Sequence, residues 1–285
     1  MRRAAISFVT ILTVVMTLAG LGLVEDVGRA EERMSVLAGV PFATVDGTVL
    51  YLDVYRPEGT GPHPAVIAVH GGSWRYGDRS QWRASAPAFT DAGLVVFAID
   101  YRLSVPGSGV RYTHAPRDIG RAVEWVRANA ATFDVDPSSL GLVGSSAGAH
   151  LALVASQRTR VGVRAVAAWS PPVNLSALAR ESLDGEGLTR SIRNYLGCSL
   201  TACPRRHVRM SPLHHIERGD PPTFLAVSSD ELIPAPQVRA MARDLRVAGV
   251  RSTLRVMPGT AHGQRLRAHV LADSVAFMKE ALTRD

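Results

Sequence analysis

The sequence predicts an α/β protein built on a mostly parallel, twisted β-sheet with helices on both faces. Short, continuous apolar runs recur along the chain, as buried parallel strands require. Segments with the helical spacing of apolar residues separate several of these runs, and this alternation is typical of a parallel sheet. With 285 residues, 46% of them hydrophobic, the chain can bury one large core. We therefore expect a single domain.

The first expected strand spans residues 48–57, where apolar and polar residues alternate as in an antiparallel or edge strand, and Pro57 closes it. Continuous apolar runs predict buried strands further along the chain. These lie at residues 65–70, 93–100, 140–144, 163–170, 222–229 and 252–259. Periodicity predicts helices at residues 115–133, 147–157, 236–249 and 264–283.

Residues 171–221 interrupt this alternation with several prolines and both cysteines of the chain. We expect a cap-like insertion of short helices and loops there. In open parallel sheets, ligands bind beyond the carboxyl ends of the strands, so the insertion could cover a site at that edge. The chemistry should therefore be sought where the apolar runs end.

The N-terminal segment has the pattern of a secretory signal peptide. Arg2 and Arg3 precede an uncharged, mostly apolar run over residues 4–24, and Gly28 and Ala30 suit a cleavage site. Residues 1–30 are therefore predicted to be removed from a secreted, extracytoplasmic protein. The alternative is an uncleaved membrane anchor, because residues 4–24 are long enough to span a bilayer.

The cysteines and the charge distribution exclude several other classes of site. Cys198 and Cys203 are the only cysteines, and in a secreted chain this pair predicts one local disulfide rather than a zinc site. No metal ligand set is expected. The net charge is +7, but the arginines are scattered and form no basic strip, so nucleic-acid binding is not expected.

A candidate nucleophile follows the apolar run at residues 140–144. The G-x-S-x-G pattern frames Ser146 between Gly144 and Gly148, whereas Ser145 lacks such a frame because Val143 stands where a glycine would be needed. In this pattern, a sharp strand-to-helix turn pushes the serine hydroxyl into the open. A side chain at either glycine position would collide with the adjacent elements.

A serine needs a base to take its proton, and the base needs an acid to orient it. His262 lies in a glycine-rich loop after a predicted strand, whereas His269 lies within a helical pattern. Asp230 follows another strand directly and is the preferred acid, with its neighbour Glu231 as the rival. The chain order serine, acid, histidine is the order of α/β-hydrolases.

The segment HGGSW after the first buried strand is the candidate oxyanion loop. Ala147, next to the nucleophile, and Gly72 and Ser73 are expected to offer backbone N–H groups to a developing oxyanion. His70 is expected to be structural. Trp74 is assigned to substrate binding, with packing beneath the pocket as the alternative.

With these residues assembled, the chain resembles an α/β-hydrolase of the esterase/lipase type, close to the feruloyl-esterase-like and arylformamidase-like carboxylesterases. The resemblance is carried by LDVYRP, AVIAVHGGSW, AIDYRL, LGLVGSSAGAHLAL and SSDELIP…PGTAHG, and the corresponding domain covers residues 40–285. It implies about eight strands, an acyl-enzyme hydrolysed by water, and no cofactor. The chain departs from the common HGGG form, because Ser73 replaces the third glycine.

The predicted function is that of a secreted serine carboxylesterase with small to medium ester substrates. Two alternatives remain: an arylformamidase-like or peptide-like amide hydrolase, and a binding protein that keeps the fold without activity. The filled triad positions argue against the binding protein. Residues 171–221 are rich in arginine and show no broad apolar face, so short acyl chains are expected to be preferred. The sequence makes no prediction of the oligomeric state.

Overall fold

The computed structural model describes residues 34–181 and 187–284. The predicted signal peptide or anchor, residues 1–30, lies outside this part of the chain. Within the described residues, no helix combines the length and the apolar character needed to cross a membrane.

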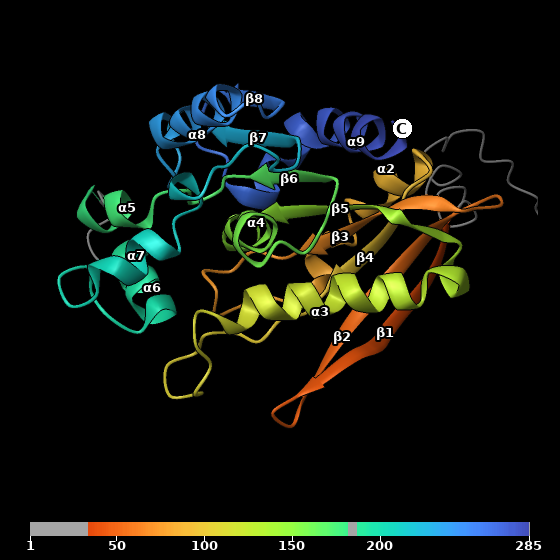
Figure 1. Ribbon diagram of the computed structural model, residues 1–285, viewed down its shortest axis with the longest axis horizontal. Helices are drawn as coiled ribbons and strands as arrows, with labels where there is room; N and C mark the ends of the chain where they lie inside the picture. The colour runs from red at the N-terminus through yellow and green to blue at the C-terminus, as the bar shows by residue number, and fades with distance from the viewer. Residues whose placement is uncertain (1–33, 182–186, 285) are drawn as a thin grey trace, which may run out of the picture.

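The described residues form one eight-stranded sheet (Figure 1). The strands are β1 (Met34–Val45), β2 (Thr48–Pro57), β3 (His63–Val69), β4 (Val95–Ile99), β5 (Val135–Ser145), β6 (Ala165–Trp169), β7 (Thr223–Ser228) and β8 (Ser252–Met257). Their order is β1-β2-β4-β3-β5-β6-β7-β8. β2 pairs antiparallel with both β1 and β4, and all other neighbours are parallel. The predicted fold class is confirmed.

Helices cover both faces of the sheet (Figure 1). They include α2 (Ala86–Asp91), α3 (His114–Ala128), α4 (Ala147–Val154), α8 (Ala235–Val247) and α9 (Arg267–Thr283). Alternate strand residues enter two separate apolar cores, as the two-residue period of a strand requires. In β3, Ala65, Ile67 and Val69 join the core beneath α3, α4 and α8, whereas Val66 and Ala68 join the core beneath α2 and α9.

One strand and one α-helix were not predicted from the sequence. β1 begins at Met34, before the expected domain start at residue 40, and most of its side chains are exposed or half-exposed. As an edge strand paired only with β2, it has no need of a continuous apolar run. The helix α2 spans only six residues, which is too short for a clear helical period.

Residues 171–221 contain the short helices α5 (Leu175–Glu181), α6 (Gly187–Leu196) and α7 (Pro204–Arg209) and the 3₁₀ turn η4 (Pro212–His214). Figure 1 shows α5, α6 and α7 grouped at one end of the sheet, in the direction in which β5, β6 and β7 point. Cys198 and Cys203 form a disulfide with Cα atoms 6.1 Å apart, which confirms the predicted pairing. Its position between α6 and α7 ties the loop that joins these two helices.

Candidate active site

The turn from β5 to α4 presents Ser146 at the carboxyl edge of the sheet. β5 ends at Ser145 and α4 begins at Ala147, and Ser146 between them has φ 52° and ψ −120°. A non-glycine residue in this region is strained, and such strain is concentrated at functional sites. Ser145 is only 2% exposed, whereas Ser146 is half-buried. The accessible hydroxyl is therefore that of Ser146.

The two glycines that frame Ser146 are needed for close packing. A Cβ atom on Gly148 would lie 2.2 Å from the carbonyl oxygen of Val69 in β3, and one on Gly144 would lie 2.4 Å from the carbonyl oxygen of Gly148. Real Cβ atoms do not approach backbone so closely. The glycines thus allow α4 to start directly against β3 and the turn to stay sharp.

His262 reaches the serine from a distant part of the chain. It lies in the loop between β8 and the 3₁₀ turn η5 (Gly263–Leu266). Its Nε2 atom is 2.7 Å from Ser146 Oγ. The predicted pairing of these two side chains is therefore present in the structure.

The carboxylate that contacts His262 belongs to Glu231 and not to Asp230, so the sequence-based preference for Asp230 is corrected. Glu231 Oε2 forms a short contact with His262 Nδ1, and its side chain is completely buried. The exposed Asp230 accepts a hydrogen bond from Ser229 Oγ, and its backbone N–H donates to Gly259. After β7 ends at residue 228, the turn directs the first acid towards solvent and the second towards the histidine.

This contact determines the tautomer of the histidine. An ionised carboxylate can only accept, so Nδ1 of His262 carries the proton that it shares with Glu231. Nε2 is then an acceptor and faces the hydroxyl of Ser146. His262 Nε2 can therefore accept the proton of the Ser146 hydroxyl.

Two further serines hold the carboxylate of Glu231. Ser170 Oγ donates to Glu231 Oε1 at 2.7 Å and accepts a hydrogen bond from the N–H of Gly263 at 2.9 Å. The backbone N–H of Ser228 donates to the same Oε1 atom at 3.1 Å. Ser170 therefore bridges the acid and the residue that follows His262. Sequence analysis missed this role, although Ser170 is the last residue of the strand expected at residues 163–170, at the functional edge of the sheet.

The glycine-rich loop after β3 packs against the serine turn. The Cβ atom of Ser146 lies 3.4 Å from the position that a Cβ on Gly71 would occupy. Gly72 has φ +119°, and its carbonyl accepts the N–H groups of Arg75 and Tyr76, which folds the loop back on itself. Among the described residues, the N–H groups of Gly72 and Ser73 have no acceptor. These two donors are therefore uncommitted, and they directly follow Gly71, which packs against the candidate nucleophile.

His70 fixes the start of this loop. Its ring stacks on Tyr101 with centroids 4.2 Å apart, its Nδ1 lies 2.7 Å from the carbonyl oxygen of Gly71, and its own carbonyl accepts from Tyr101 Oη. Burial lowers the pKa of His70 below its usual value. This neutral, buried ring agrees with the predicted structural role.

Trp74 lies in an aromatic cluster with His150 and Tyr195. Its side chain is 2% exposed, its Nε1 donates to His150 Nδ1 at 3.1 Å, and its ring stacks on Tyr195 of α6. His150 Nε2 lies 2.7 Å from the carbonyl oxygen of Met210, just after α7. Of the two roles considered for Trp74, the geometry favours packing. The cluster joins the candidate oxyanion loop, α4 and the insertion.

The protein is an α/β-hydrolase of the esterase type. This class is defined by the sheet topology, by the strand–serine–helix turn and by the similar solved structures described below. The family model described as BD-FAE matches residues 52–245. The chain therefore belongs to the BD-FAE family, which confirms the resemblance seen in the sequence.

Curated relatives of this chain are named as ester hydrolases. The probable carboxylic ester hydrolase LipM and the esterase LipQ of Mycobacterium tuberculosis are 25% and 28% identical to it, over 82% and 79% of this chain. The chain spans only 58% and 56% of the lengths of these two proteins. An ethyl acetate hydrolase of Pseudomonas putida is 28% identical, over 82% of this chain and 77% of its own length.

Solved structures share the fold over most of the chain. A truncated carbohydrate esterase from gut microbiota has a TM-score of 0.77 and 21% identity, covering 89% of this chain and 99% of its own. Thermogutta terrifontis esterase 2 phosphonylated by sarin has a TM-score of 0.70 and 25% identity, covering 88% and 96%. The same esterase with propionate bound has a TM-score of 0.69 and 25% identity, covering 89% and 97%.

Proposed function

We propose that this protein is a serine carboxylesterase that hydrolyses small carboxylic esters, with Ser146, His262 and Glu231 as its catalytic triad. The observation that carries the proposal is the continuous chain of contacts from Glu231 through His262 to Ser146. Each group is of the type that its role in acyl transfer requires. The names of the ester hydrolases similar to this chain support the same reaction.

In the first half of the proposed reaction, Ser146 Oγ attacks the carbonyl carbon of the ester while His262 Nε2 takes the serine proton. The buried carboxylate of Glu231 stabilises the imidazolium that forms. The ester C–O bond then breaks, and the leaving alcohol receives the proton from His262. The acyl group remains covalently attached to Ser146.

In the second half, water attacks the acyl carbon and His262 removes a proton from it. The bond between Ser146 Oγ and the acyl group breaks, the serine regains its proton, and the carboxylic acid leaves. No cofactor takes part in either half.

The developing oxyanion requires hydrogen-bond donors. We assign this role to the N–H groups of Gly72, Ser73 and Ala147. The first two have no acceptor among the described residues, and the third begins α4, where the orphan amides of a helix N-terminus favour negative charge. Each such donor contributes a factor of about 10² to 10³ in other acyl-transfer enzymes.

Export from the cytoplasm is part of the proposal. The signal-like pattern at residues 1–30 and the disulfide between Cys198 and Cys203 both fit an oxidising compartment. Intact mass of the protein recovered outside the cytoplasm, before and after reduction, tests both features. A retained N-terminus would favour the membrane tether through residues 4–24, and two free thiols would contradict the disulfide.

A fluorophosphonate probe tests the enzymatic function directly. We expect the purified protein to be labelled at Ser146, heat denaturation to abolish labelling, and Ser146→Ala to remove both labelling and ester hydrolysis. Ser145→Ala is the matched control and should retain most of the activity. Labelling of Ser145, or no labelling of the folded protein, would contradict the assignment. N-formylkynurenine run beside p-nitrophenyl esters separates the amide hydrolase, which would cleave the formamide faster than every ester.

A further inference from the structure

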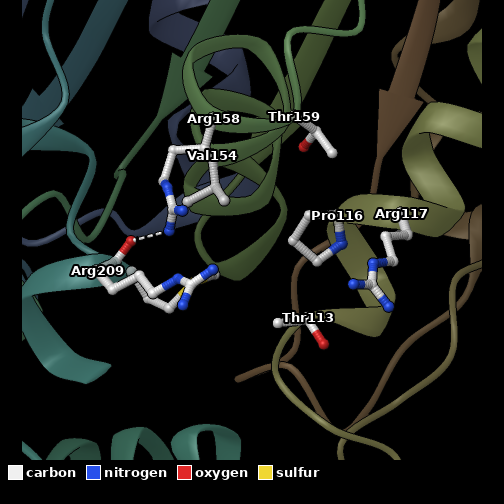
Figure 2. Close-up of a pocket in the computed structure, with 8 residues that line it drawn as sticks. Thr113, Pro116, Arg117, Val154, Arg158, Thr159 and Arg209 are labelled. Atoms are coloured by element: carbon white, nitrogen blue, oxygen red, sulfur yellow. Dashed lines mark hydrogen bonds between the residues drawn. The ribbon is translucent and has the colours of Figure 1, made fainter. Parts of the chain in front are cut away.

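A hollow of about 180 Å³ lies between the start of α3, the π-helical turn η3 (Ala155–Thr159) and α7. Figure 2 shows the residues that line it. They are Thr113, Pro116, Arg117, Val154, Arg158, Thr159, Arg209 and Met210. None of the proposed catalytic residues is among them. Val154 is the last residue of α4 and Ser146 precedes its first, so the two lie about 12 Å apart along the helix axis.

Three arginines from separate elements line the hollow, and Figure 2 shows the guanidinium groups of Arg158 and Arg209 on one side of it and that of Arg117 on the other. Arg117 comes from α3, Arg158 from η3 and Arg209 from α7 (Figure 2). Arg158 Nη1 donates to the carbonyl oxygen of Arg209 at 2.7 Å, which holds the two residues together. Within the described part of the chain, the guanidinium groups of Arg117 and Arg209 take part in no hydrogen bond or ion pair. Among the residues that the structure describes, no aspartate or glutamate lines the hollow to neutralise these charges.

The electrostatics of Arg158 agree with an uncompensated cluster of positive charge. Burial, and then the positive charge of Arg209, lower the pKa of Arg158 below its usual value. An anion between the two guanidinium groups would offset both effects, because it replaces lost solvation and screens the repulsion between like charges.

Further donors surround the same space. The hydroxyl groups of Thr113 and Thr159 have no hydrogen-bond partner in the part of the chain that the structure describes. Thr113 is the N-cap residue of the 15-residue helix α3, and the first turn of this helix contains no acidic residue. The unpaired charges, the hydroxyls and the helix N-terminus thus all favour negative charge in the hollow.

We propose that this hollow is a binding site for a phosphate group, either as inorganic phosphate or as a phosphate monoester. Planar guanidinium groups match the oxygens of phosphate in a bidentate manner. A doubly charged anion also offsets the positive charges of both Arg158 and Arg209, whereas a carboxylate offsets only one of them. The site is separate from the proposed catalytic residues, and it does not depend on their assignment.

Isothermal titration of the purified protein with inorganic phosphate at constant ionic strength tests the proposal. We expect saturable binding, and a loss of affinity of at least about tenfold in Arg158→Ala and in Arg209→Ala, because each removes charge-assisted hydrogen bonds. Arg239→Ala is the matched control, since Arg239 is an exposed arginine of α8 that does not line the hollow. Its affinity should stay within about twofold of the parent protein.

The outcomes that would overturn the proposal are equally specific. Absence of phosphate binding, equal losses in all three variants, or acetate binding as tightly as phosphate would each refute a built phosphate site. Thermal unfolding of every variant without ligand shows whether the fold is intact. In the parent protein, phosphate should also raise the unfolding midpoint, and this rise should vanish in Arg209→Ala.

Two further titrations distinguish the sources of the phosphate group. Glycerol 3-phosphate represents a soluble monoester, and phosphatidylcholine vesicles containing phosphatidic acid represent a lipid headgroup. Binding of glycerol 3-phosphate that requires Arg158 and Arg209 assigns the site to soluble monoesters. Cosedimentation with the vesicles that requires the same two arginines, without binding of glycerol 3-phosphate, assigns it to a lipid surface. Cosedimentation that survives both substitutions contradicts a role of this hollow at membranes.

Discussion

Replacing Glu231 by glutamine should abolish most of the catalytic rate while leaving the fold intact. In the parent protein, Glu231 Oε1 accepts a hydrogen bond from the N–H of Ser228, which can only donate. A glutamine in this position must keep its oxygen on that N–H. Its amide nitrogen then occupies the place of Oε2, beside His262 Nδ1.

The consequence of this orientation is a reversed histidine tautomer. The amide nitrogen donates to Nδ1, so the imidazole proton moves to Nε2, which faces Ser146 Oγ and can no longer accept. In the serine protease template, an equivalent acid-to-amide change lowers kcat by about 10⁴. We expect a loss of about 10³ to 10⁴ in kcat with little change in KM, because ground-state binding does not involve the tautomer.

The assay is steady-state hydrolysis of p-nitrophenyl acetate, with thermal unfolding measured on each variant. Asp230→Asn is the matched control. Its carboxylate is exposed and bonded to Ser229, so its kcat should stay within about twofold of the parent value. If Asp230→Asn loses activity and Glu231→Gln keeps it, the geometry has been misinterpreted and the acid is Asp230.

Three further predictions follow from the site and its surroundings. Ser170→Ala should lower kcat about tenfold with little change in KM, because Glu231 loses the hydroxyl that holds its carboxylate beside His262; an unchanged kcat would make Ser170 merely structural. Burial lowers the pKa of His150 from 6.5 to about 4, so the contribution of the neutral imidazole to stability is complete above pH 6.5 and falls by roughly 3 kcal/mol as the pH drops to 4. Over this window, the free energy of unfolding measured in urea should fall more steeply with decreasing pH in the parent than in His150→Gln, and parallel curves would contradict the shift. Among p-nitrophenyl esters from acetate to palmitate, kcat/KM should be greatest for acyl chains of about C2 to C6, and a maximum at about C12 or longer would refute this expectation.

The sequence predicted the features that depend on local pattern. Buried strands are recognisable as apolar runs. The glycines at 144 and 148 around Ser146 predict a sharp turn with close packing, and the close approach of α4 to β3 confirms it. β1 was not predicted because an exposed edge strand carries no continuous apolar run.

The choice between Asp230 and Glu231 could not be made from the sequence. Both acids follow the same strand, and the decision depends on the direction of a two-residue turn and on donors from elsewhere in the chain. Ser170, 61 residues away from Glu231, supplies one of these donors. A motif describes one segment, whereas this preference arises from three segments that meet only after folding.

The aromatic cluster of Trp74, His150 and Tyr195 has a consequence for chimeric enzymes. A single indole contacts both α4, which follows Ser146, and α6 of the insertion. A transplanted insertion without an aromatic residue at the position of Tyr195 would leave Trp74 without its stacking partner. The loop and the insertion should therefore be exchanged together, as one module, when the substrate range of this scaffold is redesigned.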